Sequence, residues 1–225
     1  IILIMEENID IKIVTTDKEY AQAMDLRRRV FVCEQHIPEE LEFDGNDHSS
    51  THVMALSAGK PVGVMRIRYF NGFVKFERMC VLPAYRKTDI SEQIMRKAME
   101  FSAQKGYDKV YGVCKKELLH RWQRNGFDTI AGTEPIMQNG MTLLPIIGPL
   151  PKTDEMISIN TDPTIINKKE GEWFGGCQNA DNERRLAKLD AMRQMAHNLR
   201  NEDVVTMPPI NNQKKINRPD NGKEY

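Results

Sequence analysis

Residues 76–91 combine residue types and spacing that suit the binding of an anion. Their pattern predicts a strand that ends at Pro83, a loop, and a helix that begins near Asp89. A helix N-terminus presents backbone N–H groups without partners inside the helix, and its dipole favours negative charge. Arg86 adds a formal positive charge to this junction. The stretch therefore predicts a site for a pyrophosphate or a similar group.

Charged residues gather in a second region, the polar loop at residues 36–50. Its carboxylates would suit a cationic amine, but they could equally form a salt-bridge network that fixes the loop. Glu77 lies next to Arg78 in a predicted strand, so it could act as a general base or form a structural ion pair. His52 begins another predicted strand, where it could be a base or a structural histidine. The residues alone leave these alternatives open.

Three segments resemble the GNAT superfamily of N-acyltransferases. The strand that ends in Val81-Leu82-Pro83 and the loop from Arg86 to Ser91 are similar to the superfamily's donor-binding loop. Residues 29–38 and 42–47 are similar to a subgroup with R-x-V-F-x-x-E-Q-x-x-P and E-x-D-x-x-D segments. Gly126-Phe127, Gly132 and Gly140-Met141 resemble the closing segment of that subgroup. The resemblance covers residues 9–148 and extends more distantly to acyl-homoserine lactone and N-acyl amino acid synthases.

The resemblance implies an N-acyltransferase that moves an acyl group to a small amine or amino acid. The donor would be acetyl-CoA, another acyl-CoA or an acyl carrier protein thioester, held between the strand ending at Val81 and the strand ending near Cys114, and no metal is expected. Expected donor-binding residues are Met79, Val81, Arg86, Lys87, Thr88, Asp89, Ile90 and Ser91. Expected acceptor-binding residues are Arg29, Phe31, Glu42, Asp44, Asp47, His52 and Arg66. Glu77 and His120 are the candidate catalytic residues.

Three positions depart from the family pattern. Asp89 and Ser91 replace residues that are usually glycine, and Trp122 stands where relatives carry a tyrosine that reprotonates the thiolate. Indole cannot supply that proton at neutral pH, and His120 is an alternative source. Asp89 could instead cap the helix with its side chain turned away from the ligand. A second interpretation is therefore a GNAT-shaped scaffold without catalysis, which serves as a binding or assembly subunit of a larger complex.

Composition excludes several function classes. Lys+Arg and Asp+Glu both number 32, so no net charge attracts nucleic acid or an anionic membrane. The four cysteines form no CxxC pair, which argues against a zinc site and a disulfide framework. The apolar start, residues 1–5, is too short for a signal peptide, and no apolar run is long enough to span a membrane. We expect a cytoplasmic protein, or one from another reducing intracellular compartment.

Hydrophobic periodicity predicts an α/β fold with the order β-α-βββ-α-β-α-β-β and helices on both faces of a mixed central sheet. The expected domain is residues 1–148, followed by an irregular linker at 149–180. An amphipathic helix is expected at 181–201 and a polar, disordered tail at 202–225. Because the apolar stripe of that helix must be buried, it could contact the domain or a protein partner.

Overall fold

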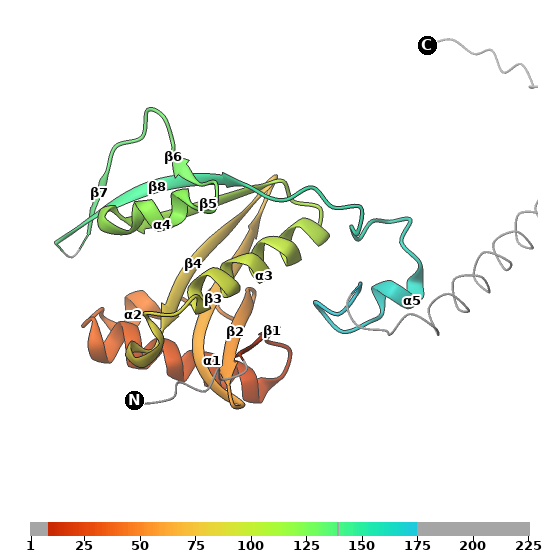
Figure 1. Ribbon diagram of the computed structural model, residues 1–225, viewed down its shortest axis with the longest axis horizontal. Helices are drawn as coiled ribbons and strands as arrows, with labels where there is room; N and C mark the ends of the chain where they lie inside the picture. The colour runs from red at the N-terminus through yellow and green to blue at the C-terminus, as the bar shows by residue number, and fades with distance from the viewer. Residues whose placement is uncertain (1–8, 139, 175–225) are drawn as a thin grey trace, which may run out of the picture. The chain divides into compact units, whose positions relative to one another are not determined.

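The computed structural model describes residues 9–138 and 140–174, which form an eight-stranded mixed sheet with helices packed on it (Figure 1). The N-terminal part comprises β1 (Ile9–Ile13), α1 (Asp17–Arg27), the π-helical η1 (Arg28–Glu34), α2 (Glu39–Glu42), β2 (Thr51–Ser57), β3 (Lys60–Phe70) and β4 (Phe73–Val81). The remainder comprises η2 (Pro83–Tyr85), α3 (Ile90–Gln104), β5 (Lys109–Lys115), η3 (Lys116–Leu118), α4 (Leu119–Gln123), β6 (Asp128–Thr129), β7 (Ile136–Gln138), β8 (Met141–Pro149) and α5 (Pro163–Ile166). The expected order of the main elements and the mixed sheet are confirmed.

The sheet runs in the order β1-β2-β3-β4-β5-β8-β6, and β7 pairs with β8. Neighbouring strands are antiparallel except β4 and β5, which are parallel. Their pairing begins at Val74–Val110 and ends at Phe76–Gly112, although both strands continue. The two strands therefore separate along their second halves and leave a gap inside the sheet.

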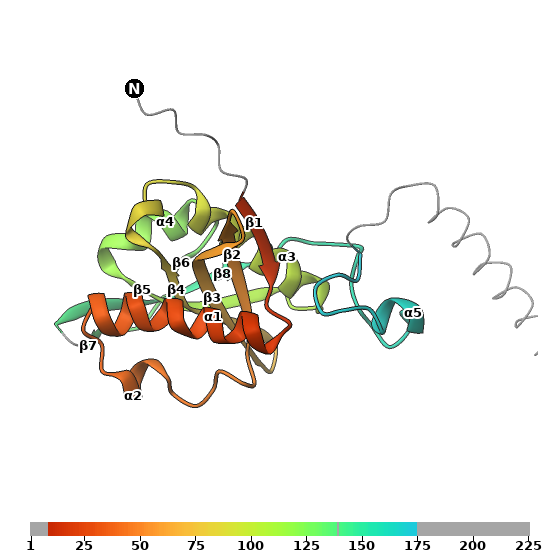
Figure 2. The same ribbon diagram turned by 90° about the horizontal axis from the view of Figure 1, so that it is seen from below.

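Two hydrophobic clusters hold α1 and α3 on opposite faces of the sheet (Figures 1 and 2). The buried residues Ala23 and Leu26 of α1 and Val30 of η1 recur at helical spacing and pack with Val64 and Cys80 of the sheet. The larger cluster contains the apolar stripe of α3 together with the other face of β2, β3 and β4. A sheet covered on both faces explains why its central strands contain nearly continuous apolar residues.

A bulge interrupts β4 where the gap opens. Arg66 of β3 pairs with Glu77 and Val64 pairs with Cys80, so two residues of β4, Arg78 and Met79, face the single residue between them on β3. Arg78 has a positive φ of 55°, which is unusual for a residue with a side chain. Such a bulge bends the strand and reorients its backbone groups. The bend turns the end of β4 away from β5.

The segment that follows β8 packs on the sheet domain. Trp173 is 5% exposed and stacks on Phe101 of α3 with ring centroids 5.4 Å apart. The ammonium of Lys105 lies 5.3 Å from the Trp173 ring and forms an ion pair with Glu170. Residues 149–174, which the sequence assigned to a linker, thus belong to the same compact unit as the sheet.

The sequence pattern missed α2, which lies in the expected loop at residues 36–50, and also β7, α5 and the π-helical conformation of η1. β7 and α5 have three and four residues, too few for a periodicity to emerge. The helix and tail expected at 181–225 lie outside the described residues. Among the helices that are described, none combines the length and apolar character needed to cross a membrane.

Candidate functional site

Two neighbouring cavities occupy the gap between β4 and β5. The α3 cavity, of about 200 Å³, is lined by Val30, Gln35, Met79, Cys80, Val81, Tyr85, Arg86, Thr88, Ser91, Glu92, Met95, Leu118, Arg121, Trp122 and Asn125. The β5 cavity, of about 310 Å³, is lined by Phe31, Gln35, Ile37, Leu41, Glu42, Phe76, Glu77, Arg78, Met79, Val113, Cys114, Lys115, Leu118, Trp122, Gln138, Met141 and Leu143. They share Gln35, Met79, Leu118 and Trp122, so a ligand in one would meet a ligand in the other beside the bulge of β4.

The α3 cavity contains five of the eight expected donor-binding residues: Met79, Val81, Arg86, Thr88 and Ser91. Among the remaining three, Lys87 and Asp89 are exposed outside its wall. Ile90 is 1% exposed and packs in the hydrophobic core. The geometry therefore gathers the end of β4, the following loop and the first turn of α3 around one space.

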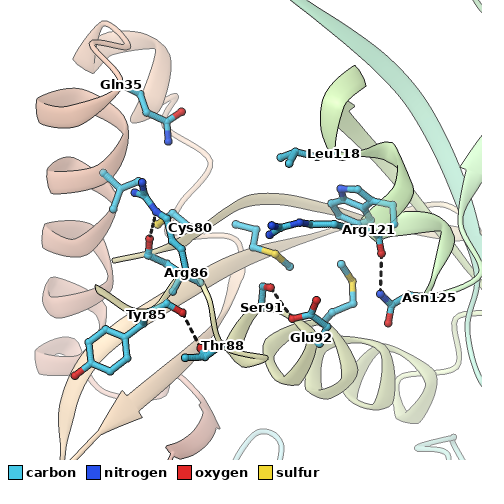
Figure 3. A pocket seen from close by; sticks show the side chains of 15 residues that line it. Gln35, Cys80, Tyr85, Arg86, Thr88, Ser91, Glu92, Leu118, Arg121 and Asn125 are labelled. Carbon is cyan, nitrogen blue, oxygen red and sulfur yellow. Dashed lines mark hydrogen bonds between the residues drawn. The ribbon is translucent and has the colours of Figure 1, made fainter. Parts of the chain in front are cut away.

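Arg86 holds the loop to its surroundings (Figure 3). Its Nε donates to the carbonyl of Val81 at 2.9 Å, and its two terminal nitrogens each donate to a carboxylate oxygen of Glu34 at 2.6 Å. These hydrogen bonds from Arg86 hold the pKa of Glu34 below its ordinary value. The cation expected to meet an anionic ligand is thus already paired with a carboxylate at the end of η1.

Arg121 is a second cation of the α3 cavity, and the sequence did not single it out. Its side chain extends from α4 into the cavity, on the side opposite the end of β4 (Figure 3). Among the described residues it has no ion pair. Asn125 lies one turn later on the same wall and donates its side-chain amide to the Arg121 carbonyl at 3.1 Å.

Two of the residues that depart from the family pattern, Asp89 and Trp122, differ in their position relative to the cavities. Asp89 occupies the N-cap position of α3, but its carboxylate accepts from the side chain of Gln93 at 2.8 Å and caps no backbone N–H. It is exposed and lies outside the wall of the α3 cavity. The expected capping hydrogen bond is not observed. Trp122 lies in the wall common to both cavities and packs edge-to-face on Phe127 at 5.0 Å.

The acidic loop is fixed by two buried arginines. Arg27 is fully buried and donates to the Glu42 carboxylate at 2.6 Å and to the Glu42 carbonyl at 2.9 Å. It also pairs with Asp47. Arg66, equally buried, pairs with Asp44 and Asp47 at 2.7 Å and with Glu77 at 2.8 Å. The carboxylates expected to bind a cationic amine are therefore occupied by internal guanidinium groups.

Glu77 lies in the wall of the β5 cavity, as its candidate role requires. Its other carboxylate oxygen accepts from Lys75 at 2.7 Å. Burial raises the pKa of Glu77, but the hydrogen bond from Lys75 and the charge of Arg66 outweigh it, so the pKa lies below the ordinary value. A carboxylate with a lowered pKa is a weak general base. The geometry favours the structural ion pair for this residue.

His52 lies on the α1 face of the sheet, opposite Arg66 in the β2–β3 pairing. It is 2% exposed, and its Nε2 lies 3.2 Å from the carbonyl of Asp47. Burial lowers the pKa of His52 to about 4, so the ring is neutral at physiological pH. It lines neither cavity, which favours the structural role.

The other expected residues divide between the walls and the surface. Phe31 lines the β5 cavity. Arg29 and His120 are exposed and line neither cavity. Arg27, two residues before Arg29, is the arginine of this segment that is buried and pairs with the acidic loop. The apolar spacing could have identified it, because Arg27 follows Ala23 by four residues and thus lies on the buried face of α1.

Comparisons with known proteins agree with this geometry. Residues 20–127 match the acetyltransferase (GNAT) family. The chain is 35% identical over 101 residues to the uncharacterized protein YyaT of Bacillus subtilis, covering 44% of this chain and 68% of that protein. It is 37% identical over 94 residues to the uncharacterized N-acetyltransferase YjcF of the same organism, covering 42% of this chain and 66% of that protein.

A solved structure shows the same fold. The crystal structure of an acyl-CoA N-acyltransferase from Pseudomonas aeruginosa superposes with a TM-score of 0.56 at 25% identity. The match covers 63% of this chain and 99% of that one. Sequence, fold and the gap between β4 and β5 thus lead to one conclusion: the chain belongs to the GNAT family of acetyltransferases.

Proposed function

We propose that the protein transfers an acyl group from acyl-CoA to the nitrogen of a small amine or amino acid. The observation that carries this proposal is the pair of cavities that meet at Met79 and Trp122, where β4 and β5 separate. One cavity adjoins a helix N-terminus and two arginines, which suits a phosphorylated donor. The other, of about 310 Å³, has both apolar and charged residues in its wall, which suits a small polar acceptor.

The residues of the α3 cavity fit an acyl-CoA. The first turn of α3 offers backbone N–H groups to phosphates, and Arg86 and Arg121 add positive charge. Apolar side chains such as Met95 and Leu118 would contact the pantetheine arm. Asp89, whose charge would oppose a phosphate, lies outside the cavity wall and accepts a hydrogen bond from Gln93.

The reaction forms one bond and breaks another. The amine nitrogen attacks the thioester carbonyl carbon, the C–N bond forms, the C–S bond breaks, the nitrogen loses a proton and the thiolate gains one. The carbonyl oxygen becomes negative on the way, so a backbone N–H at the bulge of β4 would stabilise it. With Glu77 held as a salt bridge, we infer that the amine enters neutral from solvent and that water receives its proton.

The non-catalytic scaffold is the weaker alternative. It depended on three substitutions and on the C-terminal extension, which lies largely outside the described residues. Of the substituted positions, Asp89 lies outside the wall of the α3 cavity and Ser91 within it. Trp122 removes a proton donor but leaves both cavities open, and water can protonate a thiolate. Family membership favours a transferase over a scaffold.

Calorimetry against acetyl-CoA and a long-chain acyl-CoA, followed by thiol release with a panel of amines, tests the proposal. Arg86→Gln should weaken CoA binding by about tenfold, because charge-assisted hydrogen bonds to phosphate are lost. Arg96→Gln is the matched control, because Arg96 is exposed on α3 and lines neither cavity. Absence of binding to either thioester, or equal effects of the two variants, would refute it.

A further inference from the structure

The charged residues in the wall of the β5 cavity differ in whether they have an ionic partner. Its wall contains the four charged residues Glu42, Glu77, Arg78 and Lys115. Glu42 is held by Arg27 at 2.6 Å and by Arg78 at 2.9 Å. Glu77 is held by three basic residues outside the cavity wall, Arg66, Arg68 and Lys75. Three of the four charges are therefore satisfied by the fold itself.

Lys115 is the exception. It is half-buried on β5, beyond the point where pairing with β4 ends, and within the described part of the chain it has no ion pair. Its ammonium donates to the side-chain oxygen of Gln35 at 3.2 Å. Because that oxygen is the acceptor, the amide –NH₂ of Gln35 remains available as a donor. A cation and an amide donor thus stand together at the junction of the two cavities, since Gln35 lines both.

We propose that Lys115, oriented by Gln35, binds a carboxylate of the acceptor, so that the acceptor is an amino acid and not a simple amine. This inference rests on the proposed function and specifies its substrate. A half-buried ammonium with only a neutral partner is stabilised by an anionic ligand, and Lys115 is the charge in this wall that lacks an ionic partner among the described residues.

The rest of the wall defines the side chain of that amino acid. Phe31, Ile37, Val113 and Leu143 are among its apolar residues, and the cavity measures about 310 Å³. A carboxylate at Lys115 places an α-amino group within a few ångströms of the shared wall, where the thioester would end. The cavity therefore fits an α-amino acid with an apolar side chain such as leucine.

Thiol release from acetyl-CoA with the full chain tests this inference on two acceptors, L-leucine and 3-methylbutylamine, which differ by the carboxylate. The wild type should use leucine better in kcat/KM by about tenfold. Lys115→Met should raise the KM for leucine by about tenfold with little change in kcat, and leave the KM for the amine unaltered. Lys115→Arg should restore part of the preference. Lys116→Met, at an exposed position outside both cavities, should behave as wild type.

A binding measurement separates failure of this inference from failure of the proposed function. Calorimetry with N-acetyl-L-leucine and its neutral amide needs no turnover. Tighter binding of the acid by the wild type, lost in Lys115→Met, would support the carboxylate site even if no thiol were released with either acceptor. Equal binding of acid and amide by the wild type, or an unchanged leucine preference in Lys115→Met, would overturn the inference while leaving acyl transfer intact.

Discussion

Replacing Arg27 by Met tests whether the buried ionic network stabilises the fold more than the surface charges around it do. Arg27 is fully buried and bonds to Glu42 and Asp47. Removing one partner of a buried ion pair typically costs 3–5 kcal/mol, roughly, because it leaves an uncompensated charge. Here Glu42 would keep Arg78 at 2.9 Å and Asp47 would keep Arg66 at 2.7 Å. We therefore expect the lower end of the range, about 3 kcal/mol.

Thermal and urea unfolding of the matched pair Arg27→Met and Arg29→Met provide the assay. For a chain of this size, a loss of about 3 kcal/mol lowers Tm by roughly 6–12 °C. Arg29 is exposed, so its replacement should lower Tm by less than about 2 °C. Asp47→Asn in the Arg27→Met background should cost less than the sum of the single changes, because the two residues share one interaction.

Equal effects at positions 27 and 29, or a loss below about 1 kcal/mol at position 27, would refute this account of the network. The first result would mean that burial does not decide the energetic role of these arginines. The second would mean that Arg78 and Arg66 are sufficient to neutralise the loop. Additivity in the double variant would show that Arg27 and Asp47 do not stabilise each other.

Four further predictions follow from the same contacts. The pKa of buried His52 is about 4 against an ordinary 6.5, so protonation below pH 6.5 favours the unfolded chain. The contribution of His52 to the free energy of unfolding should therefore be complete above pH 6.5 and decrease between pH 6.5 and 4. Replacement of His52 by Phe should remove this decrease in the free energy of unfolding, measured by urea unfolding at each pH. An unchanged decrease in the variant would contradict the prediction. Glu34→Gln should tighten CoA binding by roughly two- to fivefold in calorimetry, because Arg86 no longer has to leave a carboxylate to meet the phosphate. Glu39→Gln is the control, because Glu39 is an exposed carboxylate outside both cavities. Replacing Glu77 by Gln should lower kcat by less than about tenfold, whereas loss of a general base would cost about a hundredfold or more. Trp173→Ala should lower stability by about 3 kcal/mol in thermal unfolding, and no loss would show that residues 149–174 do not belong to the folded unit.

The sequence predicts the order of the sheet domain because its signals are local. The alternation of β2 to β4, the Asn71-Gly72 turn and the apolar stripe of α3 each lie within one element. The packing of residues 149–174 is not local, since it depends on Trp173 contacting Phe101, more than seventy residues earlier. No periodicity within the segment records such a contact.

The residues of the candidate site also differ in whether local sequence could identify them. The loop after β4 could be located from its residues because strand, loop and helix are consecutive in the chain. Lys115 and Arg121 carry no motif, and they belong to the site only because β5 and α4 lie across the gap from β4. Whether a carboxylate binds substrate or stabilises the fold also depends on its partners, and Arg27 and Arg66 supply these from other elements.

The two adjacent residues at the end of η1 connect these observations. Glu34 reaches Arg86 on the loop after β4, and Gln35 reaches Lys115 on β5. The end of η1 therefore contacts β5 and the loop that follows β4, on the two sides of the gap. Each contact engages a cation that a substrate would also seek, the donor at Arg86 and the acceptor at Lys115. Donor binding must loosen the Glu34–Arg86 contact, whereas acceptor binding uses the adjacent Gln35–Lys115 contact. Donor and acceptor should therefore affect each other's affinity through this turn, and Glu34→Gln should change the KM for the acceptor as well as the affinity for CoA.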